Sequence, residues 1–306
     1  MILVTGASGF IGRSLIPYLS KKGLNATPLY RSDKAEIQND VWKADLRRHE
    51  HIKELLTANI IPHTVIHLAG YVDIAIKPNI SNPQKLPIPG VQNIPLLYME
   101  NVIATANLLD FCLQTGVKHL IFASSQTVYG IPDTNIITEE SPCMPIEHYA
   151  NSKLCCEKLL QIGVKQGISI TSLRFPGVYS KERKKGVVYN FCKSAIIDKQ
   201  IIINTDLPLG IDVIYIDDVV DSFYKAYKHQ GDQWLCFNIA TGEPCSLNLL
   251  ADSIAEMIDG CHVEYGTFPQ PVIQMDSSKA QTVLGWKSLP RKKRLELIIN
   301  TIQNDR

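Results

Sequence analysis

The chain has 306 residues, 45% of them hydrophobic, and a formal net charge of +1. A chain of this length can bury a large core and can hold one large domain or two smaller ones. Its near-zero charge argues against a nucleic-acid partner, because binding to a phosphate backbone requires a basic surface.

Eight cysteines are scattered along the chain, with only Cys155 and Cys156 adjacent and no C-x-x-C pair. This usage is typical of a reduced, intracellular protein rather than of a disulfide framework or a zinc site, so we expect no metal. The chain opens directly on an apolar run without a charged leader, and we identify no long apolar span. We therefore expect no membrane insertion and a cytoplasmic location.

The first twelve residues predict a strand, a glycine turn and a helix, in that order. Ile2 to Val4 form a short apolar run, as in a strand buried on both faces, and apolar residues recur at helical period from Ile11 to Leu19. In this context a dinucleotide pyrophosphate binds at the helix N-terminus, where free N–H groups and the helix dipole favour an anion. The glycines are spaced G-x-x-G-x-x-G, which fits the usual fingerprint only loosely. The expected cofactor contacts in this stretch are Gly6, Ser8, Gly9, Phe10, Ile11 and Gly12.

The end of the second expected strand, residues 25–30, bears on the choice of cofactor. An acidic residue at this place normally binds the ribose hydroxyls and repels a 2′-phosphate. This chain has Arg31 and Ser32 instead. An arginine can pair with a 2′-phosphate, so we expect NADP to be preferred and NAD to be the alternative. A solvated surface arginine is the competing interpretation.

A third short strand is expected at 41–44, followed by a helix at 49–58. Asp45 and Leu46 directly follow the strand and are expected near the adenine of the cofactor. His51 lies on the helix, and nothing in the sequence near it suggests a ligand set, so it is expected in solvent.

A fourth buried strand is expected at 64–68. His67 stands within this apolar run and is interpreted as a core histidine with satisfied hydrogen bonds rather than as a catalyst. The small residues that follow allow a cofactor to approach closely, which adds Leu68, Ala69 and Gly70 to the expected cofactor contacts. Tyr71 comes next and is expected to contact the substrate.

The stretch 77–95 contains five prolines and little periodicity. A loop of this length after the end of a strand is expected to be functional, and its position favours a substrate lid. A helix is expected from Leu96 until Gly116, with Asn101 on its buried or pocket side.

Tyr149 and Lys153 follow the fifth expected strand, 118–123, and the serine pair at its end. A spacing of four residues places the tyrosine and the lysine on one face of a helix. A free tyrosine has a pKa near ~10 and is a poor acid–base group at neutral pH. A nearby ammonium, together with the positive charge of an oxidised nicotinamide, would favour the phenolate. This pair is therefore the candidate catalytic centre, with Ser125 beside it.

At this point the chain shows a set of motifs with a common order. TGASGFIG opens the chain, and HLAG (67–70), SSQTVYG (124–130), YANSK (149–153), LRFPGVY (173–179), IDVIYIDDV (211–219), FNIATGEP (237–244) and DSSKAQTVLGW (276–286) follow. In order and spacing they resemble the extended short-chain dehydrogenase/reductases, the NAD(P)-dependent sugar-nucleotide epimerase and dehydratase group. The resemblance extends from Met1 to about residue 286.

The resemblance implies roles for individual residues. It makes Tyr149 the acid–base residue, and it makes Lys153 the group that holds the nicotinamide ribose and lowers the tyrosine pKa. Ser125 would be the hydrogen-bonding partner of the reacting oxygen, and Asn101 would support the lysine. Pro176 and Val178 would lie beside the nicotinamide. Relatives often dimerise through the helices that correspond to 96–115 and 149–163, so a homodimer is expected.

Together, these observations predict an α/β fold with a Rossmann-type doubly wound parallel sheet and a smaller, interleaved C-terminal α/β substrate-binding lobe. Residues 1–176, joined again by 211–240, would form the NAD(P)-binding domain, and 177–210 with 241–306 the lobe. The remaining expected substrate contacts are Gln126, Thr127, Gly177, Arg183 and Lys184.

Two arginines that commonly grip the diphosphate of a sugar nucleotide in relatives are missing. Ile211 stands where many members have arginine, and the usual Arg-Pro stretch is replaced at 268–275. A diphosphate needs cationic or N–H partners. The basic run 181–185 could supply them, and a solvated loop is the competing interpretation.

The predicted activity is hydride transfer at a hydroxyl or keto carbon of a nucleotide-activated sugar, as an epimerase or a 4-ketoreductase. Dehydration is disfavoured, because dehydratases usually carry an acidic pair where this chain has Gln126 and Thr127. The missing arginines leave open an NADPH-dependent reductase of a non-nucleotide carbonyl compound. A non-catalytic NAD(P)-sensing protein is a third alternative, which the intact set Ser125, Tyr149 and Lys153 disfavours.

Overall fold

The computed structural model describes residues 1–38, 41–57, 61–72, 93–203, 210–229, 231, 233–267 and 270–305. The chain divides into two compact units. The first comprises 1–130, 142–174 and 220–237, and the second comprises 131–141, 175–219 and 238–306. Each unit is thus assembled from segments that are distant in the sequence.

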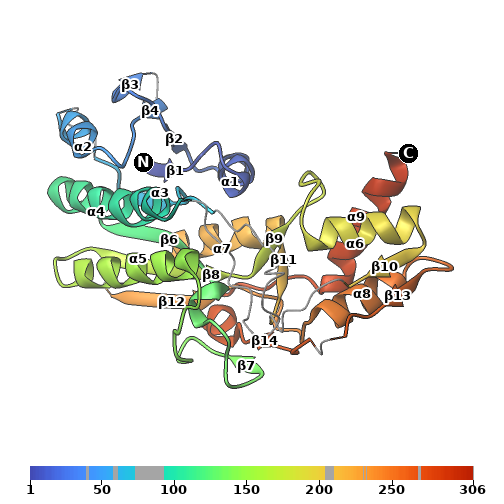
Figure 1. Cartoon of the computed structure of the whole chain (residues 1–306). Coiled ribbons are helices and arrows are strands. Elements are labelled where there is room, and N and C mark those ends of the chain that lie inside the picture. Colours follow the sequence, from blue (N-terminus) through green and yellow to red (C-terminus); the bar gives the residue numbers. More distant parts are fainter. Residues whose placement is uncertain are drawn as a thin grey trace. The chain divides into compact units, whose positions relative to one another are not determined.

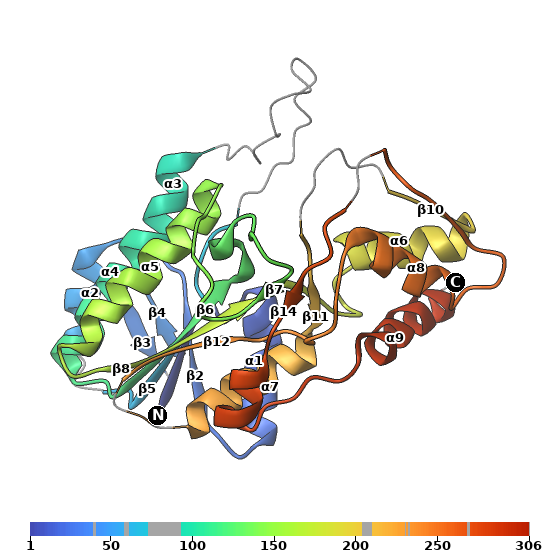
Figure 2. The same cartoon turned by 90° about the horizontal axis from the view of Figure 1, so that it is seen from below.

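The first unit contains an eight-stranded sheet with the order β12-β8-β6-β5-β1-β2-β4-β3 (Figures 1 and 2). The pairings of β1 with β2 and β5, of β2 with β4 and of β5 with β6 are parallel, and β3 is antiparallel to β4. The expected Rossmann-type parallel sheet is confirmed. Its strands are β1 (Ile2–Thr5), β2 (Ala26–Tyr30), β3 (Glu36–Gln38), β4 (Val41–Lys43), β5 (Thr64–His67), β6 (His119–Ser125), β8 (Ser169–Phe175) and β12 (Trp234–Asn238).

Helices cover both faces of this sheet. Helices α2, α4 and α5 lie along one face and α1 along the other (Figures 1 and 2). Trp42 of β4 packs edge-to-face on Phe111 of α4 in the buried core between them. The helices of the unit are α1 (Phe10–Lys21), α2 (His49–Leu56), α3 (Ile94–Tyr98), α4 (Ala104–Thr115) and α5 (His148–Val164), and α7 (Ile216–Lys228) belongs to it from residue 220 onward.

The strand order fixes where a ligand can bind. From β1 the chain proceeds outward through β2 and β4, whereas from β5 it proceeds in the opposite direction through β6 and β8. The segments that follow β1 and β5 therefore diverge toward opposite faces of the sheet. In open α/β sheets the crevice left at such a switch point, beyond the carboxyl ends of the strands, is where ligands bind.

The glycine turn after β1 is shaped by close backbone contacts. Gly6 has a φ of +65°, and a Cβ there would lie 2.6 Å from the main-chain nitrogen of Ala69. A Cβ on Gly12 would lie 2.4 Å from the carbonyl oxygen of Gly6. Gly9 caps the N-terminus of α1 in an extended conformation, and a Cβ there would meet only that same oxygen, at 3.1 Å. Only glycine fits at Gly6 and Gly12 without a shift of the backbone.

The observed helix differs in two respects from the one expected to start at Leu96. It starts earlier, at Ile94, because the Asn93 side chain accepts a hydrogen bond from the main-chain N–H of Leu96 at 2.9 Å and Pro95 stands in the first turn. The end of the proline-rich stretch is thus helical, and its residues 77–92, with the proposed lid, lie outside the described residues. The helix is also interrupted between α3 and α4 by a π-helical turn, Met99–Ile103.

The same segment, Ile94–Thr115, corrects the expectation that the chain has no long apolar span. By length and composition it is apolar enough to cross a membrane. Leu97, Leu108 and Phe111 are nevertheless buried inside the protein, as in the core helix of a globular domain.

The expectation for His51 is wrong. This histidine is only 4% exposed, and its Nδ1 accepts a hydrogen bond from the main-chain N–H of Asp45 at 2.9 Å. The donor comes from the segment that follows β4, which the helical pattern of α2 does not reveal.

The second unit combines paired short strands with three helices. Parallel pairs are formed by β9 (Gly177–Tyr179) with β11 (Val213–Tyr215), by β10 (Gln200–Ile202) with β13 (His262–Glu264), and by β7 (Ile136–Ile137) with β14 (Gln274–Met275). Its helices are α6 (Val187–Ile197), α8 (Leu247–Ala255) and α9 (Arg291–Asn304), and a π-helical turn spans Ala280–Leu284.

We expect Gly12→Ala to lower the free energy of unfolding by about 2 kcal/mol or more, because its Cβ would overlap main-chain atoms that cannot rotate away. Gly9→Ala should change the same quantity by less than about 1 kcal/mol, since its Cβ meets a single atom at a tight but tolerable distance. Urea unfolding of both variants checks this. Equal losses in the two variants would contradict the assigned packing role of Gly12.

Candidate active site

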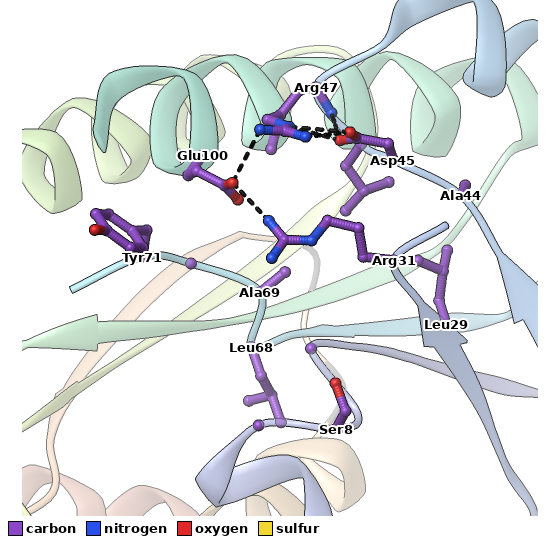
Figure 3. A pocket seen from close by; sticks show the side chains of 15 residues that line it. Ser8, Leu29, Arg31, Ala44, Asp45, Arg47, Leu68, Ala69, Tyr71 and Glu100 are labelled. Carbon is purple, nitrogen blue, oxygen red and sulfur yellow. Dashed lines mark hydrogen bonds and ion pairs between the residues drawn. The ribbon is translucent and has the colours of Figure 1, made fainter. Parts of the chain in front are cut away.

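A cavity of about 220 Å³ lies at the switch point of the sheet in the first unit (Figure 3). Most of the residues that line it are ones expected to contact a cofactor or substrate: Gly6, Ser8, Gly9, Arg31, Asp45, Leu46, Leu68, Ala69, Gly70 and Tyr71. Sequence reasoning missed five others: Leu29, Ala44, Arg47, Glu100 and Ala104. The other expected contacts are not among the residues that line this cavity. They are Phe10, Ile11, Gly12, Ser32, Asn101, Ser125, Gln126, Thr127, Tyr149, Lys153, Pro176, Gly177, Val178, Arg183 and Lys184.

The cavity has the features that a dinucleotide requires. Its floor is the glycine turn, where the chain has no side chain between the backbone and the cavity at Gly6 and Gly9. The N-terminus of α1 begins directly after this turn, so that main-chain N–H groups and the helix dipole are available to an anion. These residues fit an NAD-type cofactor.

The other end of the cavity carries four charged side chains. Arg31, after β2, donates to Glu100 Oε1 at 2.6 Å, and Arg47 donates to the same oxygen at 3.1 Å (Figure 3). Arg47 also holds Asp45, with Nε 2.9 Å and Nη2 2.5 Å from its carboxylate oxygens. Burial raises the pKa of Asp45, but the hydrogen bonds and charge of Arg47 outweigh it, so that the pKa is below its ordinary value.

Ser125 stands at the end of β6 and is linked to the candidate acid–base residue. Its Oγ accepts hydrogen bonds from the main-chain N–H of Thr127 at 3.2 Å and from Thr127 Oγ1 at 3.0 Å. A hydroxyl has one proton and two lone pairs, so this arrangement leaves the Ser125 proton for its hydrogen bond with the Tyr149 hydroxyl. Thr127 thereby orients Ser125 toward the phenol.

Burial of the phenol is the largest influence on the pKa of Tyr149. It raises the pKa well above the ordinary value, and the hydrogen bond with Ser125 lowers it. The protein alone therefore keeps the phenol protonated, and the lowering of its pKa by Lys153 together with an oxidised nicotinamide stays a prediction. A phenolate would need a further positive charge in the cavity.

Lys153 is 5% exposed and lies one helical turn after Tyr149 on α5. Its Nζ donates to the main-chain oxygen of Ala123 at 2.9 Å and lies 4.8 Å from the centre of the Phe122 ring. Burial lowers the pKa of this ammonium. A Cβ on Gly70 would lie 3.3 Å from Nζ, so Lys153 borders the segment that lines the cavity.

Asn101 lies in the π-helical turn, and its side chain is held by three hydrogen bonds. Its Oδ1 accepts from the main-chain N–H of Tyr71 at 2.7 Å, and its Nδ2 donates to the carbonyl oxygen of Tyr71 at 3.0 Å and to Ser152 Oγ at 2.8 Å. Asn101 thus fixes the main chain of Tyr71 through both its N–H and its carbonyl group. These hydrogen bonds hold Tyr71 and Ser152, and the support of Lys153 by Asn101 stays a prediction.

His67 is a core histidine, as expected, and it also connects the two sides of the cavity. Thr105 Oγ1 donates to the carbonyl oxygen of Asn101 at 2.6 Å, so it must accept from His67 Nε2 at 3.0 Å. His67 Nδ1 then accepts from Thr5 Oγ1 at 2.7 Å, and Thr5 accepts from the N–H of Ala69 at 3.2 Å. This chain of bonds requires neutral His67 with its proton on Nε2.

Gln126 opens the short helical turn Gln126–Tyr129 after β6 in the first unit, and the remaining expected site residues belong to the second unit. Pro176, Gly177 and Val178 lie at β9. Arg183 donates to the carbonyl oxygen of Val178 at 2.9 Å, and Lys184 donates to Asp305 at 2.9 Å. Both basic side chains are thus engaged by protein groups within their own unit.

Comparison with known proteins identifies the family. A model of the NAD dependent epimerase/dehydratase family matches residues 2–240. The chain belongs to this family. The predicted resemblance to the extended short-chain dehydrogenase/reductases, and to their sugar-nucleotide epimerase and dehydratase group, is confirmed.

Two curated relatives of this family are similar over nearly the whole chain. The UDP-glucose 4-epimerase of Lactobacillus helveticus is 28% identical over 330 residues, which cover 98% of this chain and 95% of that protein. The dTDP-4-dehydro-6-deoxyglucose reductase of Escherichia coli is 30% identical over 308 residues, covering 94% and 92%.

Solved structures agree in fold. MoeE5 in complex with UDP-glucose and NAD is 25% identical, with a TM-score of 0.77 and 99% of each chain covered. The UDP-glucose 4-epimerase of Thermotoga maritima, with UDP-glucose, is 24% identical, with a TM-score of 0.79 and 99% of each chain covered.

The buried His67 should make stability depend on pH. Burial and the charge of Lys153 lower its pKa to about 3, whereas an unfolded chain has a histidine pKa of about 6.5. Because only the unfolded state binds the proton between these values, the contribution is complete above about pH 6.5 and is lost as the pH falls toward 3. The loss of this contribution at pH 5 amounts to about 2 kcal/mol.

We therefore expect the free energy of unfolding of His67→Gln to fall less between pH 7 and pH 5 than that of the wild type, by roughly this amount. Urea unfolding at several pH values measures how the free energy of unfolding changes with pH. A wild-type slope in His67→Gln would contradict a neutral, buried His67.

Proposed function

We propose that the chain is an NAD(P)-dependent sugar-nucleotide epimerase or reductase, which transfers a hydride at a hydroxyl or keto carbon of its substrate with Tyr149 as the acid–base residue. The hydrogen bond between Ser125 and Tyr149 beside the buried Lys153 is the observation that carries this proposal. The relatives are named as epimerases and a reductase of nucleotide sugars, which supports the class of substrate.

The residues support a division of labour at the reacting oxygen. Tyr149 would take the proton from a substrate hydroxyl or return it to a ketone, and Ser125 would donate a hydrogen bond to the same oxygen as charge develops on it. Lys153 would hold the cofactor ribose and keep a positive charge near the phenol. The nicotinamide ring, when bound, exchanges the hydride with the adjacent carbon.

A sensor function is disfavoured by the same geometry. A protein that only senses a dinucleotide needs the cavity but has no use for the oriented set Thr127, Ser125 and Tyr149. Fixing the Ser125 hydroxyl toward the Tyr149 phenol costs conformational freedom. An enzyme that catalyses a reaction at this point benefits from the fixed geometry, whereas a sensor does not.

The choice of cofactor rests on Arg31. Solved relatives contain NAD, and an arginine at this place supports the proposal that NADP is accepted as well.

One observation favours a second candidate, a reductase of a carbonyl compound without a nucleotide. The diphosphate of a sugar nucleotide requires free cationic or N–H partners. In the second unit, Arg291 is buried against Asp212 at 3.1 Å and Arg294 against Asp218 at 2.6 Å, and Arg183 donates to the carbonyl oxygen of Val178.

A substrate panel separates these activities. We expect turnover with UDP-glucose, or with dTDP-4-dehydro-6-deoxyglucose as a keto substrate. Formation of an epimer without a net change in nicotinamide absorbance would identify an epimerase, and stoichiometric loss of NADH or NADPH absorbance would identify a reductase. Turnover of simple ketones and aldehydes alone would favour the second candidate, and cofactor binding without any turnover would contradict an enzyme.

Replacement of the proposed acid–base residue should remove catalysis and spare binding. We expect Tyr149→Phe to lower kcat by about two to four orders of magnitude, because a positioned acid–base group contributes about that factor. Cofactor affinity, measured by calorimetry, should change little. Tyr265→Phe, which removes an exposed hydroxyl bonded to Asp252, is the matched control and should retain full activity. Wild-type kcat in Tyr149→Phe would refute the role.

We further propose a homodimer formed through the segments 94–115 and 148–164. Large apolar side chains stand exposed there, with Met99 45%, Ile103 46% and Ile162 61% accessible. Apolar side chains gathered on adjacent helices are typical of an interface between copies.

Sedimentation velocity tests the dimer. The wild type should sediment as a dimer, and Ile162→Glu should sediment as a monomer, because a charge would be buried without a partner. Ile197→Glu changes an exposed residue of the second unit and should leave the dimer intact. A monomeric wild type, or a dimer unaffected by Ile162→Glu, would contradict the interface.

A further inference from the structure

One carboxylate at the ribose end of the cavity is shared by two arginines. Glu100 Oε1 accepts from Arg31 at 2.6 Å and from Arg47 at 3.1 Å (Figure 3). The residue comes from the π-helical turn Met99–Ile103, whereas Arg31 follows β2 and Arg47 follows β4. Three separate segments thus meet at this point.

The position matters because Arg31, rather than an acidic residue, directly follows β2. In dinucleotide-binding folds the carboxylate that discriminates against a 2′-phosphate usually stands there, and an arginine nearby accepts the phosphate. Here Arg31 stands at that place, and Glu100 brings a carboxylate to it from 69 residues away in the sequence. Both side chains line the cavity.

We propose that Glu100 is the residue that sets the discrimination between NAD and NADP, by competing with the 2′-phosphate for Arg31. This inference rests on the proposed binding of a dinucleotide in the cavity. With NAD, the ion pair of Arg31 and Glu100 remains intact. With NADP, the phosphate takes the place of the carboxylate at Arg31.

Exposure and pairing make such an exchange possible. The side chain of Arg31 is 63% exposed, so a phosphate can reach it from solvent, whereas that of Glu100 is only 15% exposed. Glu100 does not lose every partner when Arg31 is taken, because Arg47 remains bound to it. Arg47 is itself held in place by Asp45 at 2.5 Å. The exchange therefore leaves no partly buried charge without a partner. An unpaired buried charge would be costly.

The balance of charge explains why discrimination should be moderate. Arg31 and Arg47 attract the phosphate, and Glu100 and Asp45, which pair with them, oppose it. Arg48, 3.9 Å from Asp45, and Asp33, whose charge acts on Arg47, add one charge of each sign nearby. Because Asp45 is bound on both oxygens by Arg47, Glu100 is the carboxylate that shares its oxygen directly with Arg31. Removing the charge of Glu100 therefore leaves Arg31 free to bind a phosphate without competition.

The test is calorimetric titration of the full chain with NADH and NADPH, and with ADP-ribose and 2′-phospho-ADP-ribose, which carry the discriminating group without the nicotinamide. We expect Glu100→Gln, which has the same shape, to tighten the binding of the two phosphorylated probes about tenfold. The binding of NADH and ADP-ribose should change less than about twofold. Glu54→Gln, at an exposed position of α2, is the control and should leave all four affinities unchanged.

The same substitution in an Arg31→Ala variant separates competition for Arg31 from simple repulsion between Glu100 and the phosphate. In Arg31→Ala, the addition of Glu100→Gln should no longer tighten 2′-phospho-ADP-ribose, since the contested partner is gone. A tenfold gain that persists there would overturn competition at Arg31, and so would an unchanged ratio of the two probes in Glu100→Gln alone. If the wild type binds none of the four probes, the proposed function fails together with this inference. Binding with an unchanged ratio overturns the inference alone.

Discussion

The site depends on how closely the chain can bring the ends of β1 and β5 together. Gly6 and Ala69 approach so closely that a single Cβ on Gly6 would lie 2.6 Å from a main-chain nitrogen. The N–H of Ala69 is bonded to the side chain of Thr5, which fixes the separation of the two segments. Since β1 and β5 lead to opposite faces of the sheet, this contact defines the floor of the cavity and leaves room above it for a cofactor.

Buried polar bonds connect this floor to Asn101 and Tyr71, next to the proposed catalytic centre. The chain of bonds through Thr5, His67 and Thr105 ends at the carbonyl group of Asn101, and the Asn101 side chain in turn holds Tyr71. Each buried donor in this network has an acceptor, so the network is rigid rather than costly. Rigidity of this kind is what an acid–base pair requires, because proton transfer depends on distances fixed within a few tenths of an ångström.

The features that could be predicted from the sequence are those encoded over a short stretch. The glycine turn follows an apolar run directly, and the four-residue spacing of Tyr149 and Lys153 places them on one face of a helix without knowledge of the fold. The segments after β1, β4 and β5, which line the cavity, could also be predicted, because each directly follows a short apolar run. The role of each proposed catalytic residue remains a proposal.

The features that were missed depend on contacts between distant segments. Glu100 looks like any surface glutamate until Arg31 is brought to it, and His51 looks solvated until the main chain at Asp45 points at its ring. Burial of the Tyr149 phenol also depends on distant segments. The sequence pattern shows the neighbouring lysine but not this burial, which raises the pKa of the phenol.

The π-helical turn Met99–Ile103 shows how one irregular element serves both ends of the cavity. In a regular α-helix, consecutive residues point about 100° apart, and a long helix presents one continuous face to the sheet. The π-helical turn shifts this face by one residue, a feature that is frequent at functional sites. Asn101 is buried against Tyr71 and Ser152, while its neighbour Glu100 reaches the two arginines. The carbonyl group of Asn101 is satisfied by Thr105 and by the thiol of Cys156. The turn therefore couples the segment that supports the proposed catalytic centre to the segment that selects the cofactor, and a change in its geometry would be felt at both.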